Sequence, residues 1–429
     1  MPTPRRFLLA LTIIAEILLI GCDSNRLNTA PMPVKFTKAA TIADQAPDLT
    51  SNLPSSTTLA AATTLGGPIA GLDAGSLARF TAGQAEFQDV ETVDDGLGPV
   101  FNEASCGACH NAPLGGTTGR AETRFGKMIG GQFDPLTSLG GSLLQDHAIG
   151  LVSTEHGSYT FVPEVVPPRA SVTATRITTP LFGLGLVDAV PDAALLQLAQ
   201  LEARYSPSSA GTAHMVTEIR TGAMRVGRFG WKAQVPTLHQ FSGDAYLNEM
   251  GVTNPEFPNE NDPQGNHAAL AYNPAPQMND TGDGVQKFSD FMTLLGPPPR
   301  GPRTTATDAG GFVFRNIGCA NCHTPTLTAG DSPVPAIAHK SFQPYSDFLL
   351  HDMGSLGDGI VQGQATGKQM RTAPLWGLSS RPTYLHDGRA KTPEAAILAH
   401  DGQASDARAR YTRLDASSRT ALLAFLKSL

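Results

Sequence analysis

The chain of 429 residues has little charge, because Lys, Arg, Asp and Glu make up only 16% of it. The 38 acidic residues slightly outnumber the 31 basic ones, and no basic run is interleaved with aromatic residues. These absences exclude nucleic-acid binding, which needs a basic patch. Glycine and proline are by contrast abundant, at 44 and 33 residues, which predicts compact, loop-rich domains.

Long hydrophobic runs are also missing, except at the start of the chain. Arg5 and Arg6 precede an apolar run over 7–20, which is too short to cross a membrane comfortably. The run ends in Leu-Ile-Gly before Cys22, which resembles the cleavage box of bacterial lipoproteins. We therefore predict a lipoprotein signal peptide over 1–21 and lipid attachment at Cys22. The alternative is an unmodified Cys22 near an ordinary cleavage site.

Cysteine is scarce, but four of the five cysteines form two identical motifs. Cys319 and Cys322 are three residues apart and are followed directly by His323. Cys106, Cys109 and His110 repeat this arrangement. A CxxCH motif is the signature of covalent c-type haem attachment, in which the thiols bond the porphyrin and the histidine becomes the proximal iron ligand.

The alternative for these motifs is one zinc site with four cysteine ligands, because CxxC pairs also bind zinc. Zinc does not require a histidine at the same offset twice, and the two pairs lie far apart in the sequence. We therefore predict two covalently bound haem c groups. With Cys22 assigned to lipid, no cysteine remains for a disulfide. Haem c is generally attached outside the cytoplasmic membrane, which agrees with the predicted export.

Composition and motif positions divide the chain into segments. A flexible tether rich in Ser, Thr, Ala and Pro is expected over 22–65. The first haem module is expected over 66–221, with a helix between Asp73 and Val90 and then short helices and long loops. The second haem module is expected over 301–429. The predicted fold is therefore mainly α, with two cytochrome c-like haem modules carrying long loops and inserts.

The connecting segment over 222–300 includes an acidic, glycine-rich run from Asp280 to Gly284. Its oxygen ligands suit Ca²⁺, but the full spacing of a calcium hand is absent, so a plain turn is the alternative. A helix is expected from Gln286 to Leu295, ended by the prolines that follow.

A weak internal repeat supports two related modules. The segment Arg176 to Leu184 has a counterpart in Arg371 to Leu378, and each lies downstream of its own haem motif. In both segments Arg, Pro, Leu, Gly and Leu occur almost in register. The alternative is a coincidence of loop composition.

The sixth ligand of each iron determines its chemistry: a strong side chain there gives an electron carrier, and an open position gives a catalyst. In the second module His400 is favoured, because it is expected on a helix that Thr392 caps and Pro393 begins. The other candidates are His339, His351, Met353 and His386.

The segment from Arg371 through Tyr384-Leu-His386-Asp-Gly-Arg389 to His400 resembles the C-terminal module of bacterial di-haem cytochrome c peroxidases. It also resembles their relative that matures the quinone cofactor of methylamine dehydrogenase. In these proteins a Met or Tyr about fourteen residues after His-Asp-Gly is the sixth ligand of the second haem. The resemblance implies this role for His400, with Met353 as the alternative. Two histidine ligands lower the reduction potential relative to a His–Met pair.

The middle segment is similar to the same peroxidases, where a tryptophan, a glutamine and a Glu-Met-Gly follow one another. The resemblance implies that Trp231 is the electron bridge between the haems, and that Gln240 and Glu249 lie over the open face of the first haem. A carboxylate there can transfer the proton that peroxide cleavage requires. The spacing is one residue shorter than in the family, and Lys232 follows Trp231 where the family has Asp. The alternative is that Trp231 is a core residue and Glu249 a solvated one.

Three further segments, Gly183 to Asp188, Arg228 to Gln234 and His351 to Gly354, are more similar to another group, the bacterial di-haem oxidoreductases that are often labelled thiol oxidoreductases. This resemblance covers most of 70–429. No free cysteine is expected to remain for thiol exchange, so the label gains no support from the sequence. We predict an exported enzyme, lipid-anchored in the periplasm, that passes electrons from a small cytochrome or cupredoxin through a six-coordinate haem to an open haem that reduces a peroxide-type oxidant.

Two alternatives to this enzyme are kept. One is a non-catalytic electron-transfer lipoprotein, in which His147 or His214 closes the first iron. The other is the oxidation of an organic or protein substrate by high-valent haem, with the inserts over 111–175 and 250–300 forming a substrate surface.

Overall fold

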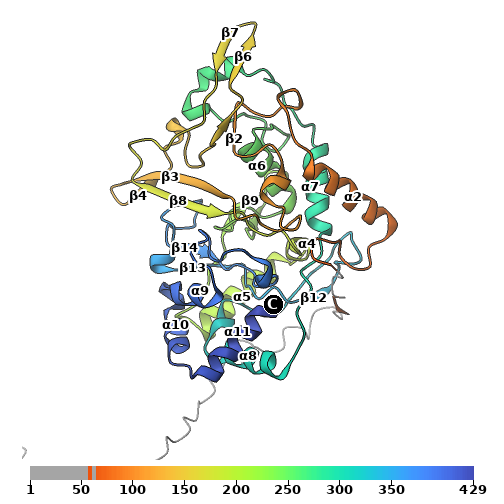
Figure 1. Cartoon of the computed structure of the whole chain (residues 1–429), viewed down its shortest axis with the longest axis vertical. Coiled ribbons are helices and arrows are strands. Elements are labelled where there is room, and N and C mark those ends of the chain that lie inside the picture. Colours follow the sequence, from red (N-terminus) through yellow and green to blue (C-terminus); the bar gives the residue numbers. More distant parts are fainter. Residues whose placement is uncertain (1–56, 60–63) are drawn as a thin grey trace, which may run out of the picture. The chain divides into compact units, whose positions relative to one another are not determined.

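The computed structural model describes residues 57–59 and 64–429 (Figure 1). The predicted signal peptide, Cys22 and most of the predicted tether lie outside these residues. Within the part of the chain that is described, no helix is both long and apolar enough to cross a membrane.

The helices are short and are separated by long loops. The α-helices are α2 Ala74–Gln88, α3 Cys106–Cys109, α4 Leu184–Asp188, α5 Asp192–Tyr205, α6 Leu238–Met250, α7 Asp283–Leu294, α8 Thr305–Asn316, α9 Pro393–Ala399, α10 Ser405–Thr412 and α11 Ala416–Lys427. The 3₁₀ helices are η2 Val93–Asp95, η3 Thr137–Leu139, η4 Pro263–Gly265, η5 His267–Tyr272, η6 Cys319–Asn321, η7 Gly354–Leu356, η8 Leu378–Ser380 and η9 Gly402–Ala404.

The structure confirms both helices expected from residue patterns in the first part of the chain. Asp73 caps α2, because its carboxylate accepts a hydrogen bond from the Ser76 N–H at 2.7 Å. Helix α7 begins three residues earlier than expected. Both carboxylate oxygens of Asp280 accept N–H groups from Gly284 and Val285, at 3.0 and 3.2 Å. The acidic loop is thus used as a helix start, and calcium binding there stays a prediction.

The strands are mostly short and antiparallel. They are β1 Thr57–Thr58, β2 Val100–Phe101, β3 Ala121–Ile129, β4 Gln132–Asp134, β5 His147–Ala148, β6 Leu151–Thr154, β7 Gly157–Thr160, β8 Val172–Ile177, β9 Met215–Thr217, β10 Met224–Val226, β11 Leu327–Thr328, β12 Lys340–Phe342, β13 Leu350–Asp352 and β14 Gln369–Arg371. The sheet β4-β3-β8 is antiparallel throughout, whereas β1 pairs with β12 in parallel.

The expectation of short helices after the first haem motif is therefore wrong for the segment over 121–177. Strands β3 and β8 pair from Ala121 opposite Ile177 to Gly126 opposite Val172 (Figure 1). Strand β8 is rich in β-branched residues, and its exposed and less exposed positions alternate, as in a half-covered strand. The expectation of a mainly helical fold is thus only partly correct, because this segment is built from strands.

Two hydrophobic clusters hold the described chain together. The larger includes α2, α4, α6 and α7, and it also includes Phe342 and Trp376 from the C-terminal part. The smaller lies mainly between α8 and α11, which run side by side (Figure 1). Gly83 permits the close approach of α2 and α7, because a Cβ there would lie 2.3 Å from the Lys287 carbonyl oxygen. The predicted segment boundaries stay predictions.

Candidate functional site

The second CxxCH motif lies in a cavity that we call the C-terminal cavity. Cys319, Cys322 and His323 line it, on and just after η6. The cavity encloses about 1570 Å³ of atom-free space, part of it open to solvent.

His400 lines the same cavity and faces His323. The centroids of the two imidazole rings are 6.4 Å apart. Two imidazoles bonded to one metal at about 2 Å from each nitrogen have centroids roughly 6 Å apart. His400 is the residue that directly follows α9 rather than a residue within it, as we had expected; Thr392 caps that helix as predicted. The spacing suits two ligands on opposite sides of one metal ion.

Hydrogen bonds leave the second nitrogen of each ring available. The Nδ1 of His323 lies 3.0 Å from the carbonyl oxygen of Tyr345. The Nδ1 of His400 lies 2.7 Å from the carbonyl oxygen of Ala396. A carbonyl oxygen can only accept, so Nδ1 carries the proton and Nε2 keeps its lone pair. Burial, with the charge of His400, lowers the pKa of His323 to about 4. The imidazole is therefore neutral, as a metal ligand must be.

The alternative ligands of the second module differ in their availability. Met353 and His386 line the C-terminal cavity. His351 also lines it, but Asp347 lies 2.9 Å from its Nε2 and Cys322 Sγ lies 3.4 Å from its Nδ1. His339 is not among the cavity residues and pairs with Asp331. Of these candidates, only His400 combines a ring facing His323 with a free Nε2.

The first CxxCH motif lies in a separate cavity that we call the N-terminal cavity, with about 1190 Å³ of atom-free space. Helix α3 consists of the motif itself, and Ser105 caps it by accepting the Ala108 N–H at 3.1 Å. The Nδ1 of His110 pairs with the Gly116 carbonyl oxygen at 3.2 Å. Burial lowers the pKa of His110 to about 4. His110 is thus prepared as a metal ligand in the same way as His323.

The N-terminal cavity has no second histidine in its described lining. His147 and His214, considered as closing ligands, both lie outside it. His214 uses both ring nitrogens elsewhere, at 2.8 Å from the Lys232 carbonyl oxygen and 3.1 Å from the Gln364 N–H. Two methionines, Met250 and Met292, line the cavity from the hydrophobic cluster.

Carboxylates gather on the wall of the N-terminal cavity instead. Glu249 on α6 accepts a hydrogen bond from the Asn102 amide at 2.7 Å. Burial, together with the negative charge of Glu122, raises the pKa of Glu249 to about 7. Burial also raises the pKa of Asp244, one turn earlier on α6, to about 6. Glu249 can therefore hold or release a proton near neutral pH.

Glu122 is a member of this group that the sequence did not indicate. It lies on β3, within the insert that we had considered as a substrate surface, and lines the cavity. Arg124 donates to both of its carboxylate oxygens, at 2.7 and 3.2 Å. No sequence motif indicates this residue, because it reaches the cavity on a strand whose partner, β8, lies far away in the sequence.

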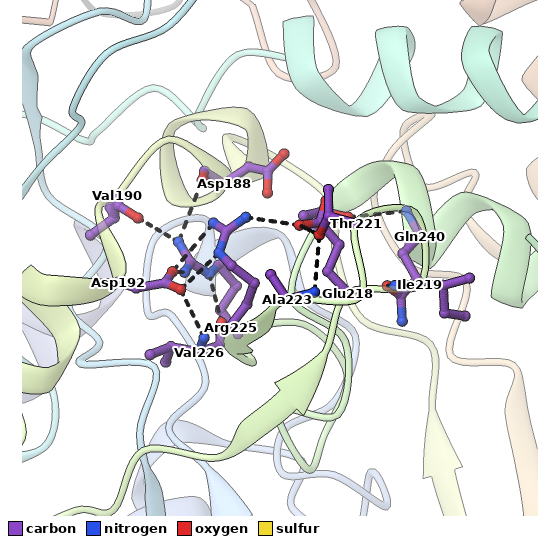
Figure 2. A network of polar contacts seen from close by, with 12 residues as sticks. Asp188, Val190, Asp192, Glu218, Ile219, Thr221, Ala223, Arg225, Val226 and Gln240 are labelled. Carbon is purple, nitrogen blue, oxygen red and sulfur yellow. Dashed lines mark hydrogen bonds and ion pairs between the residues drawn. The ribbon is translucent and has the colours of Figure 1, made fainter.

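The structure does not bring Gln240 to this cavity, although the resemblance implied a place over the first haem. Its side-chain oxygen accepts the Ile219 N–H at 2.9 Å and thereby joins a polar network around Asp192 and Arg225 (Figure 2). It lines another cavity, described below. Gln240 and Glu249 are nine residues apart on α6, which turns their side chains about 180° from each other around the helix axis, so Gln240 faces away from the cavity that Glu249 lines.

Trp231 lines both the N-terminal and the C-terminal cavity. Its indole N–H donates to the Ile177 carbonyl oxygen at 2.9 Å. The Ile177 N–H in turn donates to the His386 carbonyl oxygen at 2.7 Å. The rings of His386 and Trp231 meet edge-on, with their centroids 6.2 Å apart. Trp231 and its hydrogen-bonded neighbours Ile177 and His386 thus connect the walls of the two cavities.

The family assignment agrees with this pair of sites. Residues 169–429 match the model of a family described as "Di-haem oxidoreductase, putative peroxidase". The match covers more than half of the chain, and the protein belongs to this di-haem oxidoreductase family. No curated protein matches the chain.

Several solved structures are similar at low identity. Hydrazine synthase of Kuenenia stuttgartiensis is 15% identical over 88% of this chain and 98% of that one, with a TM-score of 0.37. A MauG-like protein associated with microbial copper homeostasis is 16% identical over 86% and 93%, with a TM-score of 0.36. The di-haem peroxidase BthA of Burkholderia thailandensis is 14% identical over 88% and 94%, with a TM-score of 0.38.

The residues of both cavities fit the haem groups that the family implies. Each cavity offers two cysteine thiols and a neutral histidine with a free Nε2. Burial raises the pKa of Cys106 and Cys319, so these thiols are protonated at neutral pH. His110, His323 and His400 would hold the two irons, and the cysteine pairs would hold the porphyrins.

Proposed function

We propose that this protein is an exported, lipid-anchored di-haem c-type peroxidase. An electron donor such as a small cytochrome or cupredoxin supplies electrons at the C-terminal cavity, and a peroxide-type oxidant is reduced at the N-terminal cavity. The haems, when bound, supply the redox chemistry and, at an open iron position, the place where the oxidant binds. The unequal surroundings of the two CxxCH histidines carry this proposal, because only His323 has a facing histidine.

Glu249 performs the proton chemistry of this proposal. Cleaving a peroxide O–O bond requires a base that takes the proton of one oxygen and delivers it to the leaving oxygen. Glu249 lies on the cavity wall with its carboxylate oriented by Asn102. Its pKa of about 7 lets it accept and return a proton without a large free-energy cost in either direction.

Trp231 provides the connection between the two sites. It belongs to the walls of both cavities and is held by its hydrogen bond to Ile177. Trp231→Phe keeps an aromatic ring but removes the indole N–H. We expect slower electron transfer between the haems in rapid-mixing experiments, with both optical spectra nearly unchanged.

The coordination of each iron tests the proposal directly. Resonance Raman and electronic spectra of the purified holoprotein should show one six-coordinate and one five-coordinate or water-bound haem. A peroxide titration in a stopped-flow instrument should then perturb only the latter. Two six-coordinate, low-spin haems that bind neither cyanide nor peroxide would contradict catalysis and favour the electron-transfer lipoprotein.

A polar cavity beside the N-terminal one favours a second candidate, oxidation of an organic or protein substrate. Arg124, Gln234, Asp244 and Asn248 line both cavities, so the polar cavity adjoins the first haem site. Its further lining is rich in side-chain amides: Gln145, Gln240, Asn259, Asn261 and Gln362. A donor screen in the presence of peroxide separates the two candidates, because only the second consumes an organic donor at this cavity.

A further inference from the structure

Two arginines in the wall of the C-terminal cavity have no acidic partner. Arg371, at the end of β14, is only 7% exposed, and Arg381 follows η8. Both line the cavity that contains His323 and His400. Neither forms an ion pair within the described residues.

Their hydrogen bonds are made to neutral backbone oxygens and are incomplete. Arg371 donates from Nε to Gly230 at 2.7 Å and from Nη1 to Thr372 at 2.9 Å. Arg381 donates from Nη2 to Pro374 at 2.6 Å, while its Nε is buried without a partner. Donors of both guanidinium groups thus remain available at the cavity wall.

Leaving these two charges uncompensated is costly. Burial lowers the pKa of each to about 10. For Arg371 the charge of Arg381 adds to this shift, and the charge of Asp347, which forms no ion pair with Arg371, opposes it only in part. A buried cation without a partner is strongly destabilising, so buried charges in proteins are normally paired.

The counterpart of Arg371 in the internal repeat shows what is missing. Arg176 is 1% exposed and lines the N-terminal cavity. It donates to Asp358 at 2.7 Å and to Gln362 at 2.6 Å. Arg176 is therefore neutralised by the protein itself, whereas Arg371 and Arg381 are not.

We propose that Arg371 and Arg381 form a binding subsite for the propionate carboxylates of the haem in the C-terminal cavity. This inference rests on the proposed function, because it requires haem attachment at Cys319 and Cys322. Guanidinium groups bind carboxylates through paired, charge-assisted hydrogen bonds. Two cations without acids match a cofactor that brings two carboxylates into the same cavity.

The other cations of this cavity do not compete for that role. Arg408 is already paired with Asp401 at 3.3 Å. Arg410 is exposed at the cavity rim, where water screens its charge. Arg410 is therefore a matched control, since its replacement removes a cation from the same cavity without removing a buried one.

The test compares the wild-type holoprotein with Arg371→Gln, Arg381→Gln, Arg371→Lys and Arg410→Gln. Resonance Raman spectroscopy reports the propionate bending bands, and a spectroelectrochemical titration reports the midpoint potential of each haem. We expect both Gln variants to shift the propionate bands and lower the potential of the second haem, because an uncompensated carboxylate stabilises the oxidised iron. Arg371→Lys should move the bands but largely keep the potential, and Arg410→Gln should leave the bands unchanged.

Propionate bands that stay unchanged in both Gln variants, with two haems present, would overturn the subsite. Arg371→Gln removes a hydrogen bond to Gly230, beside Trp231, and could therefore prevent folding. In that case Arg381→Gln decides alone, because Arg381 donates only to Pro374 and Trp376. A wild-type protein without haem at Cys319 and Cys322 would instead overturn the proposed function, and the subsite with it. Counting haems by mass distinguishes these two failures.

Discussion

The two cavities contain the same CxxCH motif but differ in what surrounds it. In the C-terminal cavity His400 faces His323, and two arginines without an ion-pair partner, Arg371 and Arg381, line the wall. In the N-terminal cavity no second histidine lines the described wall, and Glu122 and Glu249 are close to the site. The comparison teaches that the same motif occurs in both sites, whereas the side chains on the remaining walls of the two cavities differ.

The difference follows from which elements complete each cavity. The end of α9 closes the C-terminal cavity and contributes a metal-binding ring. Helix α6 and strand β3 close the N-terminal cavity and contribute carboxylates. A histidine ligand such as His400 would suit an iron that stores electrons in the C-terminal cavity. Carboxylates would suit proton transfer in the N-terminal cavity.

Removing the cysteines of one cavity should have the largest effect. Replacing Cys319 and Cys322 with Ser, or Cys106 and Cys109 with Ser, should each remove one haem and abolish peroxide turnover, since both sites are needed. Mass spectrometry of the denatured protein checks this, because only covalently bound haem survives denaturation. Two haem masses remaining in either double variant would contradict covalent attachment at these positions.

The substitution Glu249→Gln should have the next largest effect on peroxide reduction. The substitution preserves shape and the contact with Asn102 but removes the base, so peroxide reduction should fall by about 10²–10⁴-fold. Stopped-flow mixing with peroxide measures the rate, while the spectrum of the resting protein stays unchanged. Gln240→Glu is a matched control on the same helix, because Gln240 lies outside the N-terminal cavity. Equal losses in both variants would contradict the role of Glu249.

His400→Gly should make the two cavities more alike. Without this ring the second iron should lose its sixth ligand, and its spectrum should change from low spin to high spin. Added imidazole should restore the low-spin spectrum because it fills the space left by the side chain. If the spectrum stays low spin without imidazole, the sixth ligand is another residue, and Met353→Leu then tests the alternative.

Glu122→Gln should have a smaller effect, seen in the pH dependence. The negative charge of Glu122 helps to raise the pKa of Glu249 to about 7, so its removal should lower that pKa. A base acts when deprotonated, so the rate of peroxide reduction should rise with pH through the pKa of Glu249. The variant's rise should therefore lie at lower pH than that of the wild type. A rise at unchanged or higher pH would show that the two carboxyl groups do not interact.

Much of the site could be predicted from the sequence where neighbouring residues carry the information. The CxxCH motifs were recognised from local spacing, and the resemblance to the peroxidases indicated His400 through its offset from His-Asp-Gly. Helix α9 with its Thr392 cap was confirmed. The strands over 121–177 were missed, because their pairing partners lie far apart in the chain. Gln240 was expected over the first haem but lies outside the N-terminal cavity, because nine residues of helix place its side chain about 180° around the axis from that of Glu249.

The sequence by itself identified the two CxxCH motifs, because the two cysteines and the histidine of each lie within five consecutive residues and are brought together by local geometry alone. Only the tertiary structure decided which carboxylates line the same cavity as His110 and that Trp231 belongs to both cavities. It also decided that Arg176 has an ion-pair partner while Arg371 has none among the described residues. These properties depend on burial and on contacts between distant segments, since desolvation and neighbouring charge set the pKa of a side chain. Spacing along the chain does not encode either quantity.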